Sequence, residues 1–520
     1  MSAPSPPFRS IPDQLRDHAL AQPEATALVC ASERASYRSL HAAADRIAAA
    51  LQRDGLGPGT VVATCAGNSI GHVAAFLGAL RAGAAVAPLP TSATPEQLAA
   101  MFANGPARLV FTDAATAPLM RNAGLADLAV ALDGGERVAT LEGWLAGAPP
   151  QPRPVEIAPH WPFNIIYSSG TTGAPKGIAQ THARRAAHAA RAPSLGYGPG
   201  TVTLLATPLY SNTTLVALFP SLAAGATTVL MPRFGARDFL ALAERERATH
   251  TMLVPIQYQR IMALPDFDAF DLSSFRLKQC AGAPFAAELK REVLRRWPGG
   301  LVEYYGTTEG GGSCLLEAHR FPDKLHTVGR PAAGSELLAI DDQGLPLPAG
   351  RAGEIVGRSA VMMEDYHNRP GRPRETEWFD AQGRRFLRSG DVGYFDDDGF
   401  LVLVDRKKDM IISGGFNVYP SDLEAALRQH PCVAEAAVVG VPSERWGETP
   451  VAFVVLRRAA EADGAALLDW CNARVGKTQR LAAVHLVDRL PRNALGKVLK
   501  RELRERWLPV SGDNPARVVT

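Results

Sequence analysis

Apolar residues recur along the first part of the chain in an alternation typical of strands and helices. Residues 61–66 are an apolar, β-prone run, residues 71–82 have the apolar spacing of a helix, and residues 84–88 form a second apolar run. The alternation continues at residues 107–112 and 128–132. Because a strand, a helix and a strand at this spacing imply parallel pairing, we predict a doubly wound α/β body up to about residue 330.

The composition changes after this body. Residues 331–404 contain short apolar runs separated by turns rich in Asp and Gly, which is typical of a β-rich subdomain or small barrel. Farther on, a helix near residues 421–429 lies between two apolar strands, which indicates a separate small α+β domain. We therefore predict an N-terminal domain over residues 1–404, including the β-rich subdomain, and a C-terminal domain over residues 405–520.

Charge and cysteine usage exclude several classes of function. The 520 residues carry 55 Lys and Arg against 52 Asp and Glu, and this balance does not favour nucleic acid or a membrane surface as a partner. The six cysteines show no metal-ligand spacing. Residues 201–232 lack charge, but prolines and several hydroxyl and amide side chains argue against a membrane span. We expect a cytoplasmic protein without a leader peptide, and a homodimer is compatible with the sequence.

One short stretch carries the strongest chemical signal. The apolar run at residues 163–167 leads into a loop rich in hydroxyls and glycines, and a lysine follows. Such a loop can turn its backbone N–H groups and hydroxyls toward phosphate oxygens, which a linker would not need. The spacing differs from the phosphate loop of common nucleotide hydrolases, because Gly177 follows the lysine. The candidate phosphate-binding residues are Ser168, Ser169, Gly170, Thr171, Thr172, Gly173 and Lys176.

This stretch resembles the signature loop of the adenylate-forming (AMP-binding) superfamily, and it matches the family's pattern at every position. The superfamily includes acyl- and aryl-CoA ligases, peptide-synthetase adenylation domains and luciferases. The resemblance implies a large N-terminal domain of doubly wound α/β subdomains with a small β-barrel-like subdomain. A small, mobile α+β domain then follows. It also implies that the loop binds ATP.

A second motif over residues 303–312 resembles the family's Tyr-Gly-x-Thr-Glu segment. The resemblance implies that Tyr305 stacks on adenine, that Thr308 meets the α-phosphate and that Glu309 holds Mg²⁺. Thr308 and Glu309 are thereby catalytic candidates. Mg²⁺ prefers hard oxygen ligands and often binds one carboxylate together with substrate phosphates. Glu303 could accept a hydrogen bond from the adenine amino group. The other ATP-site candidates are Gly282, Ala283, Pro284, Tyr304, Gly306 and Thr307.

Three charged motifs follow in the family's order. Alone, they could be a hairpin turn, a solvated charge run and a basic tail. The resemblance implies that Asp391 accepts the ribose hydroxyls, that Arg406 also contacts the ribose, and that Lys408 is the hinge. Lys497 would bridge the acyl carboxylate and the α-phosphate. A cation between two approaching anions stabilises the transition state, so Lys497 is the principal catalytic candidate.

The implied reaction has two steps. A carboxylate attacks the α-phosphorus of ATP with Mg²⁺, giving an acyl-adenylate and pyrophosphate, and a thiol then displaces AMP. Amino acids are disfavoured, because residues 201–232 contain no aspartate for an α-amino group. A serine stands where the family often has a histidine gate. Aromatic and aliphatic acids both stay open. The acyl-pocket candidates are Tyr210, Ser211, Asn212, Gln257, Tyr304, Gly311 and Gly312.

CoA is the expected thiol acceptor. Gly414 and Gly415 lack side chains and could let a thin pantetheine arm pass, and Trp446 could contact the CoA adenine. The stretch before the last motif keeps only Lys477 and Arg480 to meet CoA phosphates. Two alternatives remain open: a stand-alone adenylation enzyme that loads an acyl group onto a carrier protein, and a catalytically silent nucleotide-binding sensor.

Overall fold

The chain forms two compact units in the computed structural model. The first comprises Met1–Ser335 with Arg358–Thr376, and the second comprises Glu336–Gly357 with Glu377–Thr520. Each unit is described by itself. The predicted domain boundary at residue 404 and the hinge near Lys408 stay predictions. The structure describes residues 8–134, 138–168, 176–363, 367, 376–413, 416–458, 460–476, 479–493 and 496–507.

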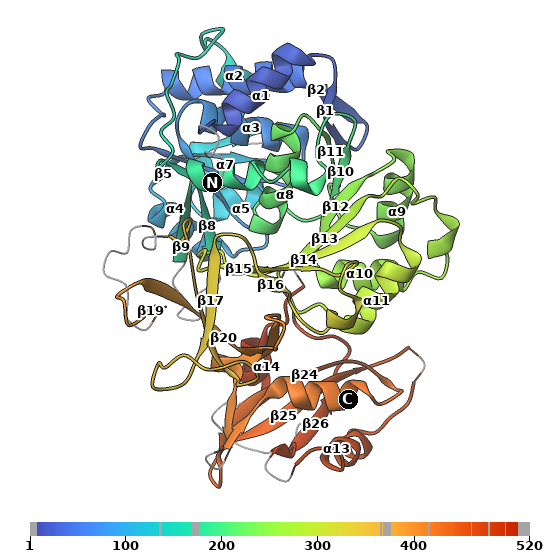
Figure 1. Ribbon diagram of the computed structural model, residues 1–520. Helices are drawn as coiled ribbons and strands as arrows, with labels where there is room; N and C mark the ends of the chain where they lie inside the picture. The colour runs from blue at the N-terminus through green and yellow to red at the C-terminus, as the bar shows by residue number, and fades with distance from the viewer. Residues whose placement is uncertain are drawn as a thin grey trace. The chain divides into compact units, whose positions relative to one another are not determined.

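One sheet of the first unit contains, within the described residues, seven strands in the order β7-β6-β5-β3-β4-β8-β9. Figure 1 labels its strands β5, β8 and β9. Its strands pair in parallel from β7 to β8, as the alternating pattern predicts, and β9 returns antiparallel beside β8. The bounds are β3 Val61–Cys65, β4 Ala85–Pro88, β5 Ala107–Thr112, β6 Ala129–Ala131, β7 Ala139–Thr140, β8 Pro162–Ser168 and β9 Lys176–Thr181.

A second sheet of this unit contains nine strands among the described residues, in the order β16-β15-β14-β13-β12-β10-β11-β1-β2. Its central strands pair in parallel, and its edge strands pair antiparallel. The bounds are β1 Thr26–Cys30, β2 Glu33–Ser36, β10 Val202–Leu205, β11 Thr227–Leu230, β12 His250–Leu253, β13 Leu277–Ala281, β14 Gly300–Gly306, β15 Ser313–Glu317 and β16 Arg330–Pro331.

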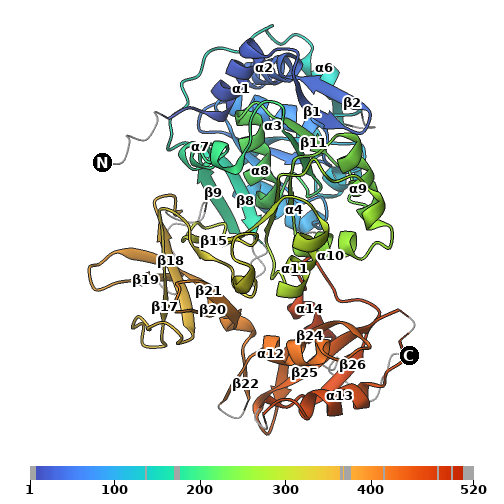
Figure 2. The same ribbon diagram turned by 45° about the vertical axis from the view of Figure 1, so that its right-hand side comes forward.

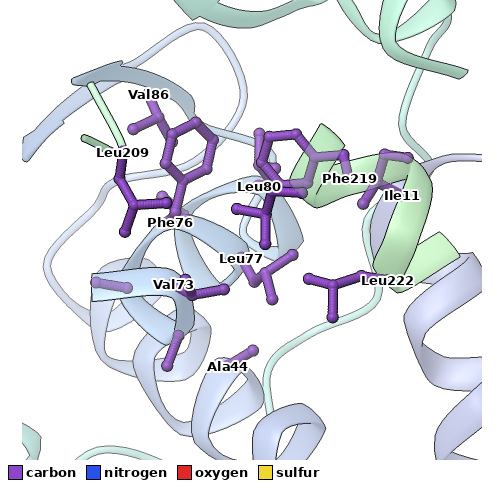
Figure 3. Close-up of a cluster of buried hydrophobic side chains, with 14 of the residues drawn as sticks. Ile11, Ala44, Val73, Phe76, Leu77, Leu80, Val86, Leu209, Phe219 and Leu222 are labelled. Atoms are coloured by element: carbon purple, nitrogen blue, oxygen red, sulfur yellow. The ribbon is translucent and has the colours of Figure 1, made fainter. Parts of the chain in front are cut away.

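The core of the first unit lies where helices α3 and α8 pack between these sheets (Figure 3). Phe76 of α3, Phe219 of α8 and Phe163 of β8 are buried, with ring centroids 4.9–6.0 Å apart. Most of the uncharged stretch at residues 201–232 is buried in this core. The helices are α1 Ile11–Ala21, α2 Tyr37–Arg53, α3 Ile70–Arg81, α4 Pro95–Asn104, α5 Ala117–Asn122, α6 Leu141–Leu145, α7 His182–Ala189, α8 Asn212–Ala223, α9 Ala236–Arg245, α10 Pro255–Met262 and α11 Ala287–Arg296.

The second unit holds two smaller sheets (Figure 2). One consists of β17 Ser335–Ile340, β18 Gly353–Ser359, β19 Glu377–Phe379, β20 Arg385–Phe395 and β21 Leu401–Arg406. The other consists of β22 Ile411–Ser413, β23 Phe416–Val418, β24 Val433–Ser443, β25 Gly447–Leu456 and β26 Ala483–Leu486. Its helices are α12 Pro420–Arg428, α13 Gly464–Asn472 and α14 Lys500–Trp507. The predicted α/β class, with a β-rich part and a small α+β part, is confirmed. Over the described residues, no helix has both the length and the apolarity needed to cross a membrane.

Candidate functional site

The strands β8 and β9 flank the predicted phosphate loop. They form an antiparallel pair in which Ser168 lies opposite Lys176, so the two ends of the loop come together (Figure 2). The Tyr167 hydroxyl donates to the Met101 carbonyl at 2.7 Å and anchors the end of β8. Residues 169–175, and with them five of the predicted loop residues from Ser169 to Gly173, lie outside the described residues.

The second motif lies beside these strands. Residues 307–309 follow directly after β14, and Gln180 of β9 donates from Nε2 to the Thr308 carbonyl at 3.4 Å. The Met363 N–H donates to the Glu309 carbonyl at 2.9 Å. Tyr305, Thr308 and Glu309 each keep part of their surface exposed. The fold therefore brings two motifs that are about 130 residues apart in sequence to one place.

The side chain of Glu303 points to the opposite face of β14 from those of Val302 and Tyr304, because side chains alternate between the two faces of a strand. Its carboxylate is 3% exposed and forms an ion pair with Lys290 of α11. Lys290 Nζ also donates to the carbonyls of Leu325 at 2.9 Å and Thr327 at 3.0 Å. Burial raises the pKa of Glu303 to about 7, against the opposing effect of Lys290. The carboxylate is thus engaged inside the protein, and its predicted contact with adenine stays a prediction.

The other predicted adenine wall is a turn after β13. Gly282 has φ +95°, a conformation that favours glycine, and it is exposed together with Pro284, while Ala283 is partly exposed. A Cβ at Gly282 would lie 3.6 Å from Thr213 Oγ1 near the start of α8. This turn and the start of α8, where acyl-pocket candidates were predicted, are therefore neighbours.

Several predicted acyl-pocket side chains hold the local backbone. Ser211 is the N-cap of α8, because its hydroxyl accepts from the Thr213 N–H at 3.2 Å. Gln257 accepts from the Val254 N–H at 3.1 Å and donates to the Ala206 carbonyl at 3.0 Å. These bonds explain why a serine is suited to the position of the family's histidine. The contacts of Ser211 and Gln257 with the acyl substrate stay predictions.

Tyr304 points to the face of β14 opposite that of Glu303. Its hydroxyl donates to Gln279 Oε1 at 3.1 Å, and Gln279 Nε2 donates to the Tyr197 hydroxyl. The Tyr197 ring stacks on His250 with centroids 4.4 Å apart. Burial raises the pKa of Tyr304 to about 12, so it is a neutral hydroxyl near pH 7. If Tyr304 contacts the acyl group as predicted, it does so as a neutral phenol.

Sequence reasoning missed two arginines of α7. Arg184 and Arg185 are 6% and 0% exposed. Arg185 donates to Asn164 Oδ1 from Nε at 3.0 Å and from Nη2 at 2.8 Å, and Nη2 also donates to Asn212 Oδ1 at 2.8 Å. Asn212 was a predicted acyl-pocket residue. A signal was present in the sequence, since two adjacent arginines stand in an alanine-rich helix directly after the phosphate-loop hairpin.

The second unit brings together the later charged motifs. Asp391 of β20 lies opposite Arg406 of β21, and Arg406 Nε lies 2.9 Å from Asp391 Oδ1. Asp391 is 6% exposed. The Ser389 hydroxyl accepts from the Asp391 N–H at 3.0 Å and fixes the turn. The two predicted ribose-binding side chains therefore lie side by side in this unit.

Lys497 lies near the same ion pair. Its N–H donates to Asn493 Oδ1 at 2.9 Å. Partial removal from water lowers the pKa of Lys497 to about 8, helped by the positive charges of Arg406 and Lys408. Removal from water also lowers the pKa of Lys408, the predicted hinge. A lysine with a pKa near 8 is still mostly a cation at pH 7.

The predicted CoA contacts are described in part. Trp446 precedes β25 and is 47% exposed, and the Arg445 guanidinium lies 4.7 Å from its ring centroid. A flat exposed ring with a cation above it is suited to a nucleotide base near a phosphate. Gly414 and Gly415 lie outside the described residues.

Magnesium was the predicted metal, with Glu309 as its protein ligand. Within the described residues, no group of three or more His, Cys, Asp or Glu side chains could hold a metal ion by itself. A single carboxylate fits Mg²⁺ when substrate phosphates supply most of the other ligands.

Two family models match the chain. The AMP-binding enzyme model matches residues 15–367, and the AMP-binding enzyme C-terminal domain matches residues 422–497. The chain is 31% identical over 500 residues to a fatty acid–acyl-carrier-protein ligase, ScoC, of Streptomyces coeruleorubidus, covering 94% of this chain and 95% of that protein. It is 34% identical over 515 residues to an indoleacetate–CoA ligase of Aromatoleum aromaticum, covering 94% and 96% respectively.

The fold is also similar to those of solved structures. The crystal structure of ATP-bound MatB from Rhodopseudomonas palustris superposes with a TM-score of 0.85 at 29% identity, covering 96% of this chain and 98% of that chain. The fold, the paired motifs and these matches together place the chain in the adenylate-forming, AMP-binding enzyme family, within its branch of acyl- and aryl-CoA ligases.

Proposed function

We propose that this protein activates a carboxylic acid with ATP and transfers the acyl group to CoA, releasing pyrophosphate and AMP. The observation that carries the proposal is the contact of Gln180 with the Thr308 carbonyl, which joins the phosphate-loop hairpin to the Thr308–Glu309 segment. ATP phosphates need hydroxyls, backbone N–H groups and a cation at one place, and these two segments have the residue types that could supply them.

In the first unit, the proposed roles follow from side-chain chemistry. Lys176 and the hydroxyls of the loop bind the β- and γ-phosphates, and Thr308 contacts the α-phosphate. Tyr305 stacks on adenine. Glu309 would hold Mg²⁺, which supplies positive charge to the phosphate oxygens when it is bound. The reaction needs no acid or base at this point, because the attacking carboxylate is already an anion.

In the second unit, Asp391 and Arg406 bind the ribose, and Lys497 provides the cation for adenylation. The carboxylate of the substrate and the α-phosphate are both negative, so they repel each other as they approach. A lysine placed between them offsets this repulsion most strongly in the transition state. Lys408 is the proposed hinge that withdraws Lys497 before thioester formation.

The acceptor distinguishes two proposals. The exposed Trp446 with Arg445 above its ring favours CoA, which carries an adenine and several phosphates. A carrier protein is the second candidate, and the similarity to a fatty acid–acyl-carrier-protein ligase favours it. Both acceptors present a thiol to the same adenylate, so the first half of the reaction is shared.

The test is a panel of carboxylic acids with ATP and Mg²⁺, in which pyrophosphate release is recorded with and without CoA. Fatty acids of graded length, benzoates, cinnamates and arylacetates are included. We expect release that rises with CoA and gives a thioester detected by mass spectrometry. Acid-dependent pyrophosphate exchange without a thioester would favour a carrier protein. ATP binding without exchange for any acid would indicate a nucleotide-binding sensor and contradict the proposal.

Two lysine variants control this assay. Lys497→Ala should abolish most pyrophosphate release. Lys500→Ala is the matched control, because Lys500 lies three residues away and pairs with Glu424 at 2.9 Å within the fold. If both variants turned over like the parent, Lys497 would have no role in adenylation.

A further inference from the structure

The two buried arginines of α7 have few partners among the described residues. Arg185 is completely buried, and the acceptors of its hydrogen bonds are the neutral amide oxygens of Asn164 and Asn212. In the described part of the chain, Nη1 of Arg185 has no hydrogen-bond partner. The two asparagines orient this guanidinium without neutralising it.

Arg184 is 6% exposed, and its Nε and Nη1 atoms also have no hydrogen-bond partner among the described residues. The charge that acts favourably on it is that of Glu309. Burial lowers the pKa of Arg184 to about 10, which still leaves it a cation at pH 7. Its Nη1 would lie 2.9 Å from a Cβ added at Gly310. The space left by this glycine is therefore taken by a cation.

Unsatisfied polar atoms concentrate around this pair. Eight buried side-chain nitrogens and oxygens of β8, β9 and α7 have no hydrogen-bond partner among the described residues. Leaving such groups unpaired is costly, and a buried charge without a partner costs most. The residues are Asn164, Gln180, His182, Arg184, Arg185 and His188.

A packing role for both arginines explains this arrangement poorly. Elsewhere in the same unit, the buried Lys278 donates to three carbonyls at 2.6–2.9 Å, so all its hydrogens are satisfied. Lys290 is satisfied by two carbonyls and Glu303. Among the described residues, these two buried lysines are thus satisfied, and the α7 arginines differ from them.

The position of the arginines indicates where a missing anion would come from. Asn212, which receives Arg185, is the first residue of α8, and Gly310 follows directly after Glu309. Both positions belong to the side of the site where the acyl group was predicted. We propose that the Arg184–Arg185 pair receives a second acidic group of the acyl substrate, so that this enzyme activates acids with an anionic group at the end away from the reacting carboxylate. This inference rests on the proposed function.

A planar guanidinium pairs with a carboxylate through two parallel hydrogen bonds, so it distinguishes a carboxylate from an ester or methyl group. The same chemistry would also bind pyrophosphate, the other anion in the reaction. Arg185 donates to Asn212 at the start of α8, an acyl-pocket candidate, which favours the acyl substrate. Experiments with both anions distinguish the two sources.

The test compares matched acids by the kcat/KM of pyrophosphate release. The pairs are hexanoate with adipate, decanoate with sebacate and benzoate with isophthalate, and monomethyl adipate serves as the neutral analogue. We expect at least one diacid to be preferred over its partner by roughly 30-fold or more, the scale of unpairing a buried charge. The monomethyl ester should behave like hexanoate.

Two variants assign the preference to the arginines. Arg184→Gln should reduce the preference, measured as the ratio of kcat/KM for the diacid and its matched monoacid, to about threefold or less. Arg185→Lys keeps the charge but loses the planar fork, and it should lower the preference in part. Lys278→Met is the matched control, because it removes another buried cation and should keep the preference. A thermal shift with ATP shows that each variant is folded.

The outcomes separate the inference from the proposed function. Turnover of monoacids with no preference for any diacid would overturn the inference alone. Added pyrophosphate, a product, should inhibit the reaction. If it inhibited the arginine variants less than the parent while the diacid preference stayed, the arginines would be assigned to the phosphates, and this would also overturn the inference. A folded, ATP-binding protein with no turnover of any acid would overturn both.

Discussion

Replacing Glu303 with glutamine should change how the stability of the first unit depends on pH. Glu303 is 3% exposed and paired with Lys290, and its pKa is raised by burial from 4.5 to about 7. A raised pKa means that the folded state binds more protons than the unfolded state between these values. The stabilisation is complete below about pH 4.5 and is lost as the pH rises through about 7.

The size of this effect follows from the two pKa values. A rise from 4.5 to about 7 corresponds to about 3 kcal/mol, of which about 2 to 3 kcal/mol is lost between about pH 5 and about pH 8. Glutamine does not titrate, so Glu303→Gln avoids this loss. The free energy of unfolding of the variant, relative to the parent, should therefore rise by this amount across the same interval.

Hydrogen exchange of the β13 and β14 amides measures the effect locally. Parent and variant are compared at the same pH, so intrinsic exchange rates cancel. Between about pH 5 and about pH 8, the ratio of their exchange rates should change on the order of 50-fold, with the variant becoming relatively more protected. Glu317→Gln on β15 is the control, because it makes the same substitution at a partly buried glutamate of the neighbouring strand. A ratio for Glu303→Gln that does not change with pH would refute the reasoning.

Three further predictions concern the charged site and the core. Because the pKa of Lys497 is about 8, kcat/KM for ATP should fall above about pH 8 as the cation is lost, and a profile flat to about pH 10 would contradict this role. Asp391→Asn removes the charge beside Arg406 and should weaken ATP binding roughly tenfold by calorimetry; unchanged affinity would exclude a ribose contact. Phe219→Ala should lower the free energy of unfolding in urea by about 3–5 kcal/mol, and a loss below about 1 kcal/mol would indicate a loosely packed core.

The sequence predicted the fold class and the order of the motifs because both depend on local signals. Apolar periodicity identified β3, α3 and β4, and strand–helix alternation implied their parallel pairing. The serine cap of α8 could also have been read from Ser211 before two polar residues. These features need only a few neighbouring residues to be recognised.

The environment of single side chains could not be predicted in this way. Glu303 and Tyr305 are two residues apart on one strand, yet only the pairing of Glu303 with Lys290 from another element shows that its carboxylate is engaged. The environment of Arg185 is likewise set by Asn164 and Asn212, which lie on β8 and α8 and accept its hydrogen bonds. Such contacts depend on how elements pack, which a single sequence does not specify.

The formation of an acyl-adenylate is tested most directly with a carboxylic acid labelled with oxygen-18 in its carboxyl group. In the proposed reaction, the carboxylate attacks the α-phosphorus and AMP later leaves with one carboxylate oxygen. Mass spectrometry should therefore find one labelled oxygen in AMP and none in pyrophosphate. Label in pyrophosphate or phosphate, or unlabelled AMP beside a newly formed thioester, would contradict the account.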